Sequence, residues 1–410
     1  MKQDRALEIM LSGANVMLTG QAGAGKSYTI NKFVEAAKRK RKKVVVTATT
    51  GLAATQIGGS TIHSWSGIGL DNKLHEDYIY TISETRKKAM RKTDVLIIDE
   101  ISMMHDYNLD MIDQAMRIVR ENDEPFGGLQ VILVGDFFQL PPVQQGGAGN
   151  FVTESEVWGK MNIKVCYLEE SYRTEDPRLQ DVLNAMRDGT LNQKHVDVMR
   201  SRIGVKPVGK ITRLYTTNLD VERINNSKLN ALEGEMRYFL RTSTGRSYGD
   251  LIKLQKNVLA PEVLRLKTNA MVMAVKNDVE LRYANGSIGV VDGWTKDGFP
   301  IVDFGGRYSV TVYPEQWEYR KQDKVTATIT QIPLRLAYAI TVHKSQGMTL
   351  DAAEMDLTNT FVAGMGYVAL SRVKNLDNLY LKGLSRNAFA VSAKAREIDT
   401  KLREQSRSLI

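Results

Sequence analysis

The sequence has almost no cysteine and no long apolar run, and each shortage excludes a class of protein. Cys166 is the only cysteine, so no intrachain disulfide and no cysteine-based zinc site can form, which favours a reducing compartment. No stretch reaches the about 18 apolar residues of a membrane span, and the N-terminal residues lack an apolar segment before a small-residue cleavage site. Internal repeats and low-complexity linkers are also missing. We therefore expect a cytoplasmic protein without a membrane partner.

The charge balance is nearly even for a chain of this length. Among 410 residues, 56 Lys and Arg stand against 47 Asp and Glu, which gives a net charge of +9. This excess favours an anionic partner only weakly, because solubility alone would account for it. The length is too great for one ordinary core and predicts two domains with smaller insertions.

Apolar runs in the first half predict a parallel sheet. Val16–Leu18 leads into a glycine-rich loop, which is followed by apolar residues at helical spacing up to Ala37 and then by Val44–Val46. Val95–Ile98 and Val131–Val134 are apolar without alternation, as strands buried on both faces of a parallel sheet are. The first half is therefore predicted to be α/β.

The second half predicts another α/β pattern with a β-rich insertion. A helix is expected around Val182–Met186 and a strand at Ile211–Thr217. Further along, Asn285-Gly286, Asp297-Gly298 and Gly305-Gly306 separate short alternating runs, as the turns of successive β-hairpins do. These hairpins predict a small inserted β-barrel.

Gly20–Ser27 fits the pattern G-x-x-x-x-G-K-[ST] between a predicted strand and a predicted helix, the context that this motif requires. The loop amides and the helix N-terminus would surround the β-phosphate of a nucleotide. Lys26 would reach the β- and γ-phosphates, and Ser27 would bind magnesium. A chance glycine turn is a weak alternative in this context. The residues predicted to contact ATP here are Gly20, Ala22, Gly23, Ala24, Gly25, Lys26, Ser27 and Tyr28.

Polar residues follow two of the predicted strands at the edge where ligands of a parallel sheet bind. Asp99 is expected to hold the magnesium through water, and Glu100 to activate the attacking water. A lone Asp-Glu pair is more often a surface turn, but a phosphate loop needs such a metal partner. Asp136 and Gln139 repeat the placement, and Gln139 would position water against the γ-phosphate.

Besides the phosphate loop, seven short segments with recognisable sequences follow one another over nearly the whole chain. They are Thr47–Ala54, Gly58–Ser64, Ile97–Met103, Val134–Pro142, Tyr172-Arg173, Val342–Gly347 and Tyr367–Arg372. In this order they resemble motifs Ia, Ib, II, III, IV, V and VI of the petite-integration-frequency (Pif) helicases of superfamily 1B, whose near relatives are RecD and the phage helicase Dda. The resemblance implies an α/β fold with two RecA-like P-loop domains.

The resemblance also implies roles that single residues do not reveal. Gln3 falls where the family's adenine-reading glutamine lies, and Gln346 and Gly347 match the nucleotide-sensing part of motif V. Arg173 and Arg372 match two arginines that contact the γ-phosphate from the second domain and stabilise charge in the transition state. Taken alone, either arginine would be a surface salt bridge.

Contacts with a DNA strand are predicted at short hydroxyl and imidazole donors, which suit phosphate oxygens. These residues are Thr50, His63, Thr341, His343 and Ser345. The two histidines could equally be partly buried structural residues. Trp65, Phe137 and Phe138 could stack on bases, although apolar residues near core strands more often pack. The basic run Lys38–Lys43 is interpreted as a solvated helix end rather than a DNA contact.

Domain boundaries follow from the same resemblance. Residues 1–160 would form the first RecA-like domain, with a wedge insertion at about 71–92. The polar residues of this stretch are compatible with a long loop, a small helical insertion or a hairpin. Residues 161–275 and 331–410 would form the second, and 276–330 an SH3-like insertion. The chain resembles the minimal helicase core of bacterial or phage members, which implies a bacterial or phage-infected cell.

The implied activity is ATP-dependent DNA unwinding with Mg²⁺ as cofactor. The protein would move 5′ to 3′ on single-stranded DNA as a monomer and act at single-strand/duplex junctions, forks, RNA–DNA hybrids and G-quadruplexes, in replication, repair or recombination. One alternative is a nucleic-acid clamp that uses ATP as a switch without unwinding. Another is a small-molecule P-loop kinase, which would leave the second α/β domain and its arginines unexplained.

Overall fold

A computed structural model describes residues 1–57, 59–69, 71–144, 147–170, 174–207, 211–245, 248–276, 278, 280, 282–283, 286–321 and 324–409. The chain divides into two compact units. One contains Met1–Lys210 together with Ser345–Ile410, and the other contains Ile211–Lys344. The domain boundaries expected above rest on the family resemblance, and they stay a prediction.

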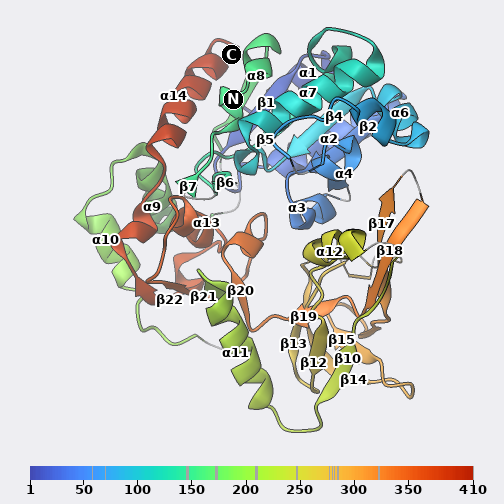
Figure 1. The fold of residues 1–410 in the computed structure, drawn as a ribbon. Coiled ribbons are helices and arrows are strands. Elements are labelled where there is room, and N and C mark those ends of the chain that lie inside the picture. The colour runs from blue at the N-terminus through green and yellow to red at the C-terminus, as the bar shows by residue number, and fades with distance from the viewer. Residues whose placement is uncertain are drawn as a thin grey trace. The chain divides into compact units, whose positions relative to one another are not determined.

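A parallel sheet with the strand order β3-β2-β4-β5-β1-β8 forms the centre of the first unit (Figure 1). Its strands are β1 (Val16–Gly20), β2 (Val44–Ala48), β3 (Ser60–Thr61), β4 (Val95–Asp99), β5 (Gln130–Gly135) and β8 (Lys164–Leu168). The four strands predicted from apolar runs are confirmed. Because all the pairs are parallel, the carboxyl ends of these strands meet at one edge of the sheet.

The strands of this sheet are apolar on both faces because helices cover them. Leu18 packs in one cluster with Met10 of α1 (Gln3–Leu11) and Phe33 of α2 (Lys26–Arg39). Met17 and Leu96, which point to the opposite face, are as completely buried as Leu18. This two-sided burial explains why the strand sequences show no alternation.

The remaining helices of the first unit follow the sheet strands or close the unit. They are α3 (Gly51–Gln56), α4 (Ile62–Ser66), α5 (Tyr78–Thr81), α6 (Glu84–Arg91), α7 (Asp106–Arg120), α8 (Glu156–Lys160), α9 (Pro177–Asp188), α10 (Gln193–Arg200), α13 (Met365–Leu370) and α14 (Ala393–Arg407), with 3-10 turns η1 (Ile101–Met103), η2 (Pro125–Gly128), η3 (Val152–Glu154), η5 (Leu376–Asn378) and η6 (Arg386–Phe389). Helix α14 packs on β8, where the Ser406 hydroxyl accepts from the Tyr167 amide at 3.1 Å. The helix predicted around Val182–Met186 is confirmed as α9.

Two short strand pairs complete the first unit. β21 (Ala353–Leu357) and β22 (Leu379–Leu384) are parallel, and β6 (Val143–Gln144) and β7 (Gly147–Ala148) are antiparallel. The polar stretch at 71–92 contains α5 and α6, so of the three interpretations left open the helical one is confirmed; its role as a wedge stays a prediction.

The second unit combines one parallel strand pair with antiparallel sheets. β9 (Thr212–Tyr215) and β20 (Ala339–Thr341) are parallel, beside α11 (Asn218–Asn230). An antiparallel sheet has the order β16-β15-β14-β13-β19, a second has the order β11-β18-β17, and β10 pairs with β12. These elements are β10 (Arg237–Leu240), β11 (Thr242–Gly245), α12 (Tyr248–Asn257), β12 (Val263–Leu266), β13 (Met271–Ala274), β14 (Ile288–Trp294), β15 (Pro300–Asp303), β16 (Val310–Thr311), β17 (Glu315–Lys321), β18 (Lys324–Gln331) and β19 (Leu334–Leu336). The 3-10 turn η4 (His343–Ser345) contains the point in the chain where the second unit ends.

The hairpin turns predicted at Asp297-Gly298 and Gly305-Gly306 lie between β14, β15 and β16 as expected. Of the third turn, Asn285 lies outside the described residues. The α/β class with parallel sheets is confirmed, whereas the closed SH3-like form of the insertion stays a prediction. Among the described residues, no helix is both long and apolar enough to cross a membrane.

Candidate nucleotide-binding site

A pocket of about 320 Å³ lies at the carboxyl edge of the parallel sheet in the first unit. Its lining contains most of the side chains that the sequence predicts for ATP, although they come from segments more than 300 residues apart. The lining residues are Ala22, Gly23, Gly25, Lys26, Ser27, Tyr28, Asp99, Glu100, Gln139, Gly347, Thr349, Arg372 and Lys374.

The phosphate loop joins β1 to α2 and has the shape that its glycines permit. Gly20 has a φ of 147°, and a Cβ there would lie 2.5 Å from the Leu168 carbonyl oxygen. Gly25 precedes α2 in the left-handed conformation, with φ 82° and ψ 23°. Because Gly25 has no side chain to cap the helix, the first amide N–H groups of α2 remain for an anion.

Lys26 lies at the first position of α2 and points back over the loop. Its ammonium donates to the carbonyls of Gly20 at 2.8 Å and Gln21 at 3.0 Å. Burial lowers the pKa of Lys26, although Asp136 and Glu100 oppose this effect. A lysine held by loop carbonyls at the mouth of an anion site can exchange them for phosphate oxygens, which are stronger acceptors.

Asp99 and Glu100 lie at the end of β4, facing the same pocket. Glu100 is in the left-handed conformation, with φ 54° and ψ 42°, which is rare outside glycine and is favoured at functional sites. Its carbonyl accepts from the Thr49 hydroxyl at 2.9 Å. Burial, together with the nearby Glu100 carboxylate, raises the pKa of Asp99 to about 7. A bound divalent cation would favour the ionised carboxylates.

Two buried glutamines flank the carboxylates. Gln346 donates from Nε2 to Glu100 Oε2 at 2.9 Å. The Oε1 atoms of Gln346 and Gln139 have no hydrogen-bond partner within the described part of the chain. A buried amide oxygen without a partner is unfavourable unless a ligand or water completes it. Gln139 lines the pocket and can offer this oxygen to a polar ligand there, whereas Gln346 is not among the lining residues and contacts Glu100 instead.

Arg372 lines the pocket from the segment directly after α13, and its side chain is fully buried. Its guanidinium donates to the carbonyls of Ser345 at 3.3 Å and Met348 at 3.1 Å, and its Nε donates to Val368 O at 2.7 Å. Arg173, the other predicted γ-phosphate arginine, lies outside the described residues.

The predicted ATP residues do not all line the pocket. Gly20 and Ala24 form the loop behind it, and Gln3 donates from Nε2 to the Ala24 carbonyl at 3.3 Å. Thr349 and Lys374 line it although the sequence analysis did not select them. Both lie two residues beyond a recognised motif residue, Gly347 and Arg372, so extending each motif by two residues would have included them.

The five candidate DNA contacts differ in accessibility. Thr50 and His63 are half-buried, and burial lowers the pKa of His63. In the second unit, Thr341 is buried and His343 is half-buried, with its pKa also lowered by burial. The Ser345 side chain is completely buried. Their role in DNA binding stays a prediction.

The aromatic residues near motif III belong to the core. Phe137 and Phe138 are 2% and 1% exposed, and Phe137 packs edge-on against Phe151 with ring centroids 5.6 Å apart. The packing interpretation is thereby confirmed for these two residues, whereas Trp65 is half-buried on α4.

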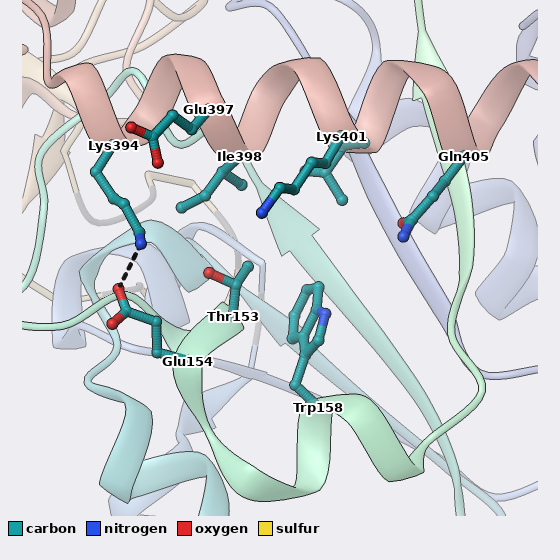
Figure 2. A pocket seen from close by; sticks show the side chains of 9 residues that line it. Thr153, Glu154, Trp158, Lys394, Glu397, Ile398, Lys401 and Gln405 are labelled. Carbon is teal, nitrogen blue, oxygen red and sulfur yellow. Dashed lines mark ion pairs between the residues drawn. The ribbon is translucent and has the colours of Figure 1, made fainter.

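A smaller hollow of about 200 Å³ lies between α14 and the segment formed by η3 and α8 (Figure 2). Trp158 and Lys401 face it from opposite sides, and Lys394 pairs with Glu154 at 3.8 Å. Its lining includes neither the phosphate loop nor the paired carboxylates, and we assign it no ligand.

Comparison with known proteins gives consistent results for sequence and structure. A family model described as PIF1-like helicase matches residues 5–197. The chain is 38% identical to the ATP-dependent DNA helicase Pif1 of Psychrobacter, over 99% of this chain and 71% of that protein. The crystal structure of Pif1 helicase from Candida albicans is similar with a TM-score of 0.90 and 35% identity, over 98% of each chain. A Bacteroides Pif1 helicase in complex with ADP-AlF3 and single-stranded DNA is similar with a TM-score of 0.78 and 29% identity, over 99% of this chain and 97% of that one.

Proposed function

Because the chain belongs to the PIF1-like helicase family, we propose that it moves 5′ to 3′ along single-stranded DNA and separates the strands of duplexes, forks, RNA–DNA hybrids and G-quadruplexes. Family membership makes the protein an ATP-dependent DNA helicase. One observation supports a hydrolytic motor above other uses of ATP. Lys26, Asp99, Glu100, Gln139 and Arg372, which phosphoryl transfer to water requires together, line a single pocket.

Magnesium fits the residues that face the phosphate loop. Ser27 and Asp99 supply a hydroxyl and a carboxylate oxygen in the same pocket, and hard oxygen ligands are those that Mg²⁺ prefers. The two residues would hold the ion, which would supply charge neutralisation for phosphoryl transfer. No cluster of three or more His, Cys, Asp or Glu suited to a metal occurs among the described residues.

The attacking water would be activated by Glu100 and oriented by Gln139. Glu100 lies beside the phosphate loop with its backbone fixed by Thr49, so its carboxylate can accept the proton of a water in line with the γ-phosphate. Arg372 would stabilise the charge that develops on the γ-phosphate oxygens. We also propose the DNA contacts at Thr50, His63, Thr341, His343 and Ser345, and the domain boundaries given above.

Polarity and unwinding can be measured on two matched partial duplexes, one with a 5′ single-stranded tail and one with a 3′ tail. We expect ATP-dependent unwinding from the 5′ tail alone. Lys26→Ala should lose unwinding, because the ammonium that reaches the β- and γ-phosphates is gone. Lys40→Ala, which removes an exposed lysine after α2, is the matched control and should keep it. Unwinding from the 3′ tail alone would contradict the polarity, and DNA-stimulated hydrolysis without unwinding of either substrate would favour the clamp.

Affinity for single-stranded DNA should fall steeply with salt. If Lys and Arg neutralise about three to five phosphates, with a log–log slope of about −0.7 for each, affinity falls roughly 20-fold to 130-fold between about 50 and 200 mM salt. Fluorescence anisotropy of a labelled oligonucleotide measures this dependence. Lys40→Gln, in the run interpreted as a solvated helix end, should leave the slope unchanged. A flat salt response of the unaltered protein would argue against binding along the phosphate backbone.

A further inference from the structure

A buried cation joins several segments of the first unit behind the nucleotide pocket. Arg187, on α9, is 3% exposed. Its Nη1 donates to both carboxylate oxygens of Asp136 at 2.8 and 2.9 Å, and its Nη2 donates to Asp399 at 3.1 Å. The Phe138 ring packs 4.2 Å from the guanidinium carbon. A buried charge is tolerated only when it is paired and hydrogen-bonded, so this geometry leaves the group little freedom.

The Tyr367 hydroxyl connects this buried pair to the phosphate loop. It accepts from Arg187 Nη1 at 2.9 Å and from the Ala22 amide at 3.3 Å, and it donates to Asp136 Oδ2 at 3.1 Å. One donor and two acceptor positions are thus all in use. Burial raises the pKa of Tyr367, so the group stays a neutral phenol that can donate to Asp136.

Tyr367 also belongs to the segment that carries Arg372. Helix α13 begins after Gly364, where a Cβ would lie 2.7 Å from the carbonyl oxygens of both Phe138 and Gln139. A side chain there would prevent this close approach, and the φ of 88° is itself one that favours glycine. The helix ends at Leu370, and Arg372 Nε donates back to the Val368 carbonyl at 2.7 Å. One short helix therefore contacts the Gln139 loop, the phosphate loop and the predicted γ-phosphate arginine.

We infer that Tyr367 is a positioning residue for ATP hydrolysis, whose hydroxyl, held by Arg187 and Asp136, sets where Arg372 lies relative to the phosphate loop. This inference rests on the hydrolytic function proposed above. The hydroxyl lies behind the loop and contacts the Ala22 amide, so it acts through the arginine and the loop.

Tyr167 provides a matched control for the hydroxyl. It is also buried, and its hydroxyl accepts from Arg187 Nη2 at 2.8 Å and donates to Asp399 at 2.8 Å. Unlike Tyr367, it lies on β8, and within the described part of the chain its hydroxyl contacts only Arg187 and Asp399. Tyr367→Phe and Tyr167→Phe each remove one hydroxyl partner from Arg187. Only Tyr367→Phe also removes the contact with the Ala22 amide of the phosphate loop.

The first measurement is DNA-stimulated ATP hydrolysis by the full chain. We expect Tyr367→Phe to lower kcat about tenfold, the scale of one hydrogen bond lost from a positioned group, with KM for ATP within about twofold of the unaltered protein. Tyr167→Phe should leave kcat within about twofold. Thermal unfolding should show similar losses of melting temperature for both variants, because each leaves Arg187 with one partner fewer.

The second measurement asks whether Tyr367 acts through Arg372. In an Arg372→Ala background, measured in single turnovers with excess enzyme, Tyr367→Phe should change the rate less than about twofold, because residues that act as a unit are not additive. A structural role would instead give the same tenfold loss in both backgrounds.

Three results would overturn the inference. They are an equal loss of kcat in Tyr167→Phe, an unchanged loss in the Arg372→Ala background, and a folded Tyr367→Phe protein with normal kcat. Failure of the hydrolytic function on which the inference rests is recognised separately, because the unaltered protein would then show no DNA-stimulated hydrolysis before any variant is tested.

Discussion

Glu100→Gln is expected to reduce ATP turnover by about 10²- to 10⁴-fold while ATP and DNA binding persist. The loss has the size of a general base, because the amide cannot accept the proton of the attacking water. The replacement keeps the shape of the side chain, and its Oε1 can still accept from Gln346 Nε2, as the carboxylate does at 2.9 Å. Geometry is therefore preserved while basicity is removed.

Glu121 is the matched control for this variant. It too is a glutamate in the left-handed conformation, with φ 53° and ψ 44°, but it ends α7 with an exposed side chain. Glu121→Gln should leave turnover unchanged. Steady-state hydrolysis and equilibrium binding of a fluorescent ATP analogue measure the two effects, and turnover near that of the unaltered protein in Glu100→Gln would show that another group is the base.

Arg372→Ala should slow hydrolysis by roughly 10³- to 10⁵-fold, the value of an arginine that stabilises the transferred phosphoryl group. Nucleotide binding should change far less, because the charge that Arg372 meets develops mainly in the transition state. The unfolding temperature should also fall, since truncation leaves the buried carbonyls of Ser345 and Met348 without this donor. Arg372→Lys should recover only part of the rate, since lysine lacks the planar fork.

Arg202→Ala is the control that separates a loss of stability from a loss of catalysis in Arg372→Ala. The Arg202 guanidinium also donates to backbone carbonyls, those of Leu379 and Asp377, at 2.9 and 2.8 Å. It does not line the nucleotide pocket, so this variant should lose stability without losing kcat. Normal DNA-stimulated turnover in Arg372→Ala, or an equal loss in Arg202→Ala, would rule out the assigned role.

Short-range patterns predicted much of the fold and of the site. The phosphate loop at Gly20–Ser27 is recognisable because a strand, a glycine turn and a helix are adjacent in the chain. Asp99 and Gln139 could be assigned to the same edge because each follows an apolar strand, and parallel strands end together. The helix α9 and the hairpin turns around β15 were likewise predicted from spacing and turn residues.

Other features could not be predicted because their partners are remote in the chain. Gln346 contacts Glu100 across 246 positions, and Arg187 contacts Asp136 and Asp399 across 51 and 212. The periodicity of a helix predicts that such a residue faces the interior, but it does not predict which charged side chain will be its partner.

Local residue patterns thus established an α/β ATPase with a phosphate loop and paired carboxylates, since these depend on neighbours within a few residues. The tertiary structure alone decided that Phe137 and Phe138 pack in the core, that Thr349 and Lys374 line the pocket, and that the Tyr367 hydroxyl reaches the phosphate loop. These outcomes depend on how helices dock on the sheet. That docking depends on apolar side chains from many segments being buried together, so the sequence of one segment does not determine it.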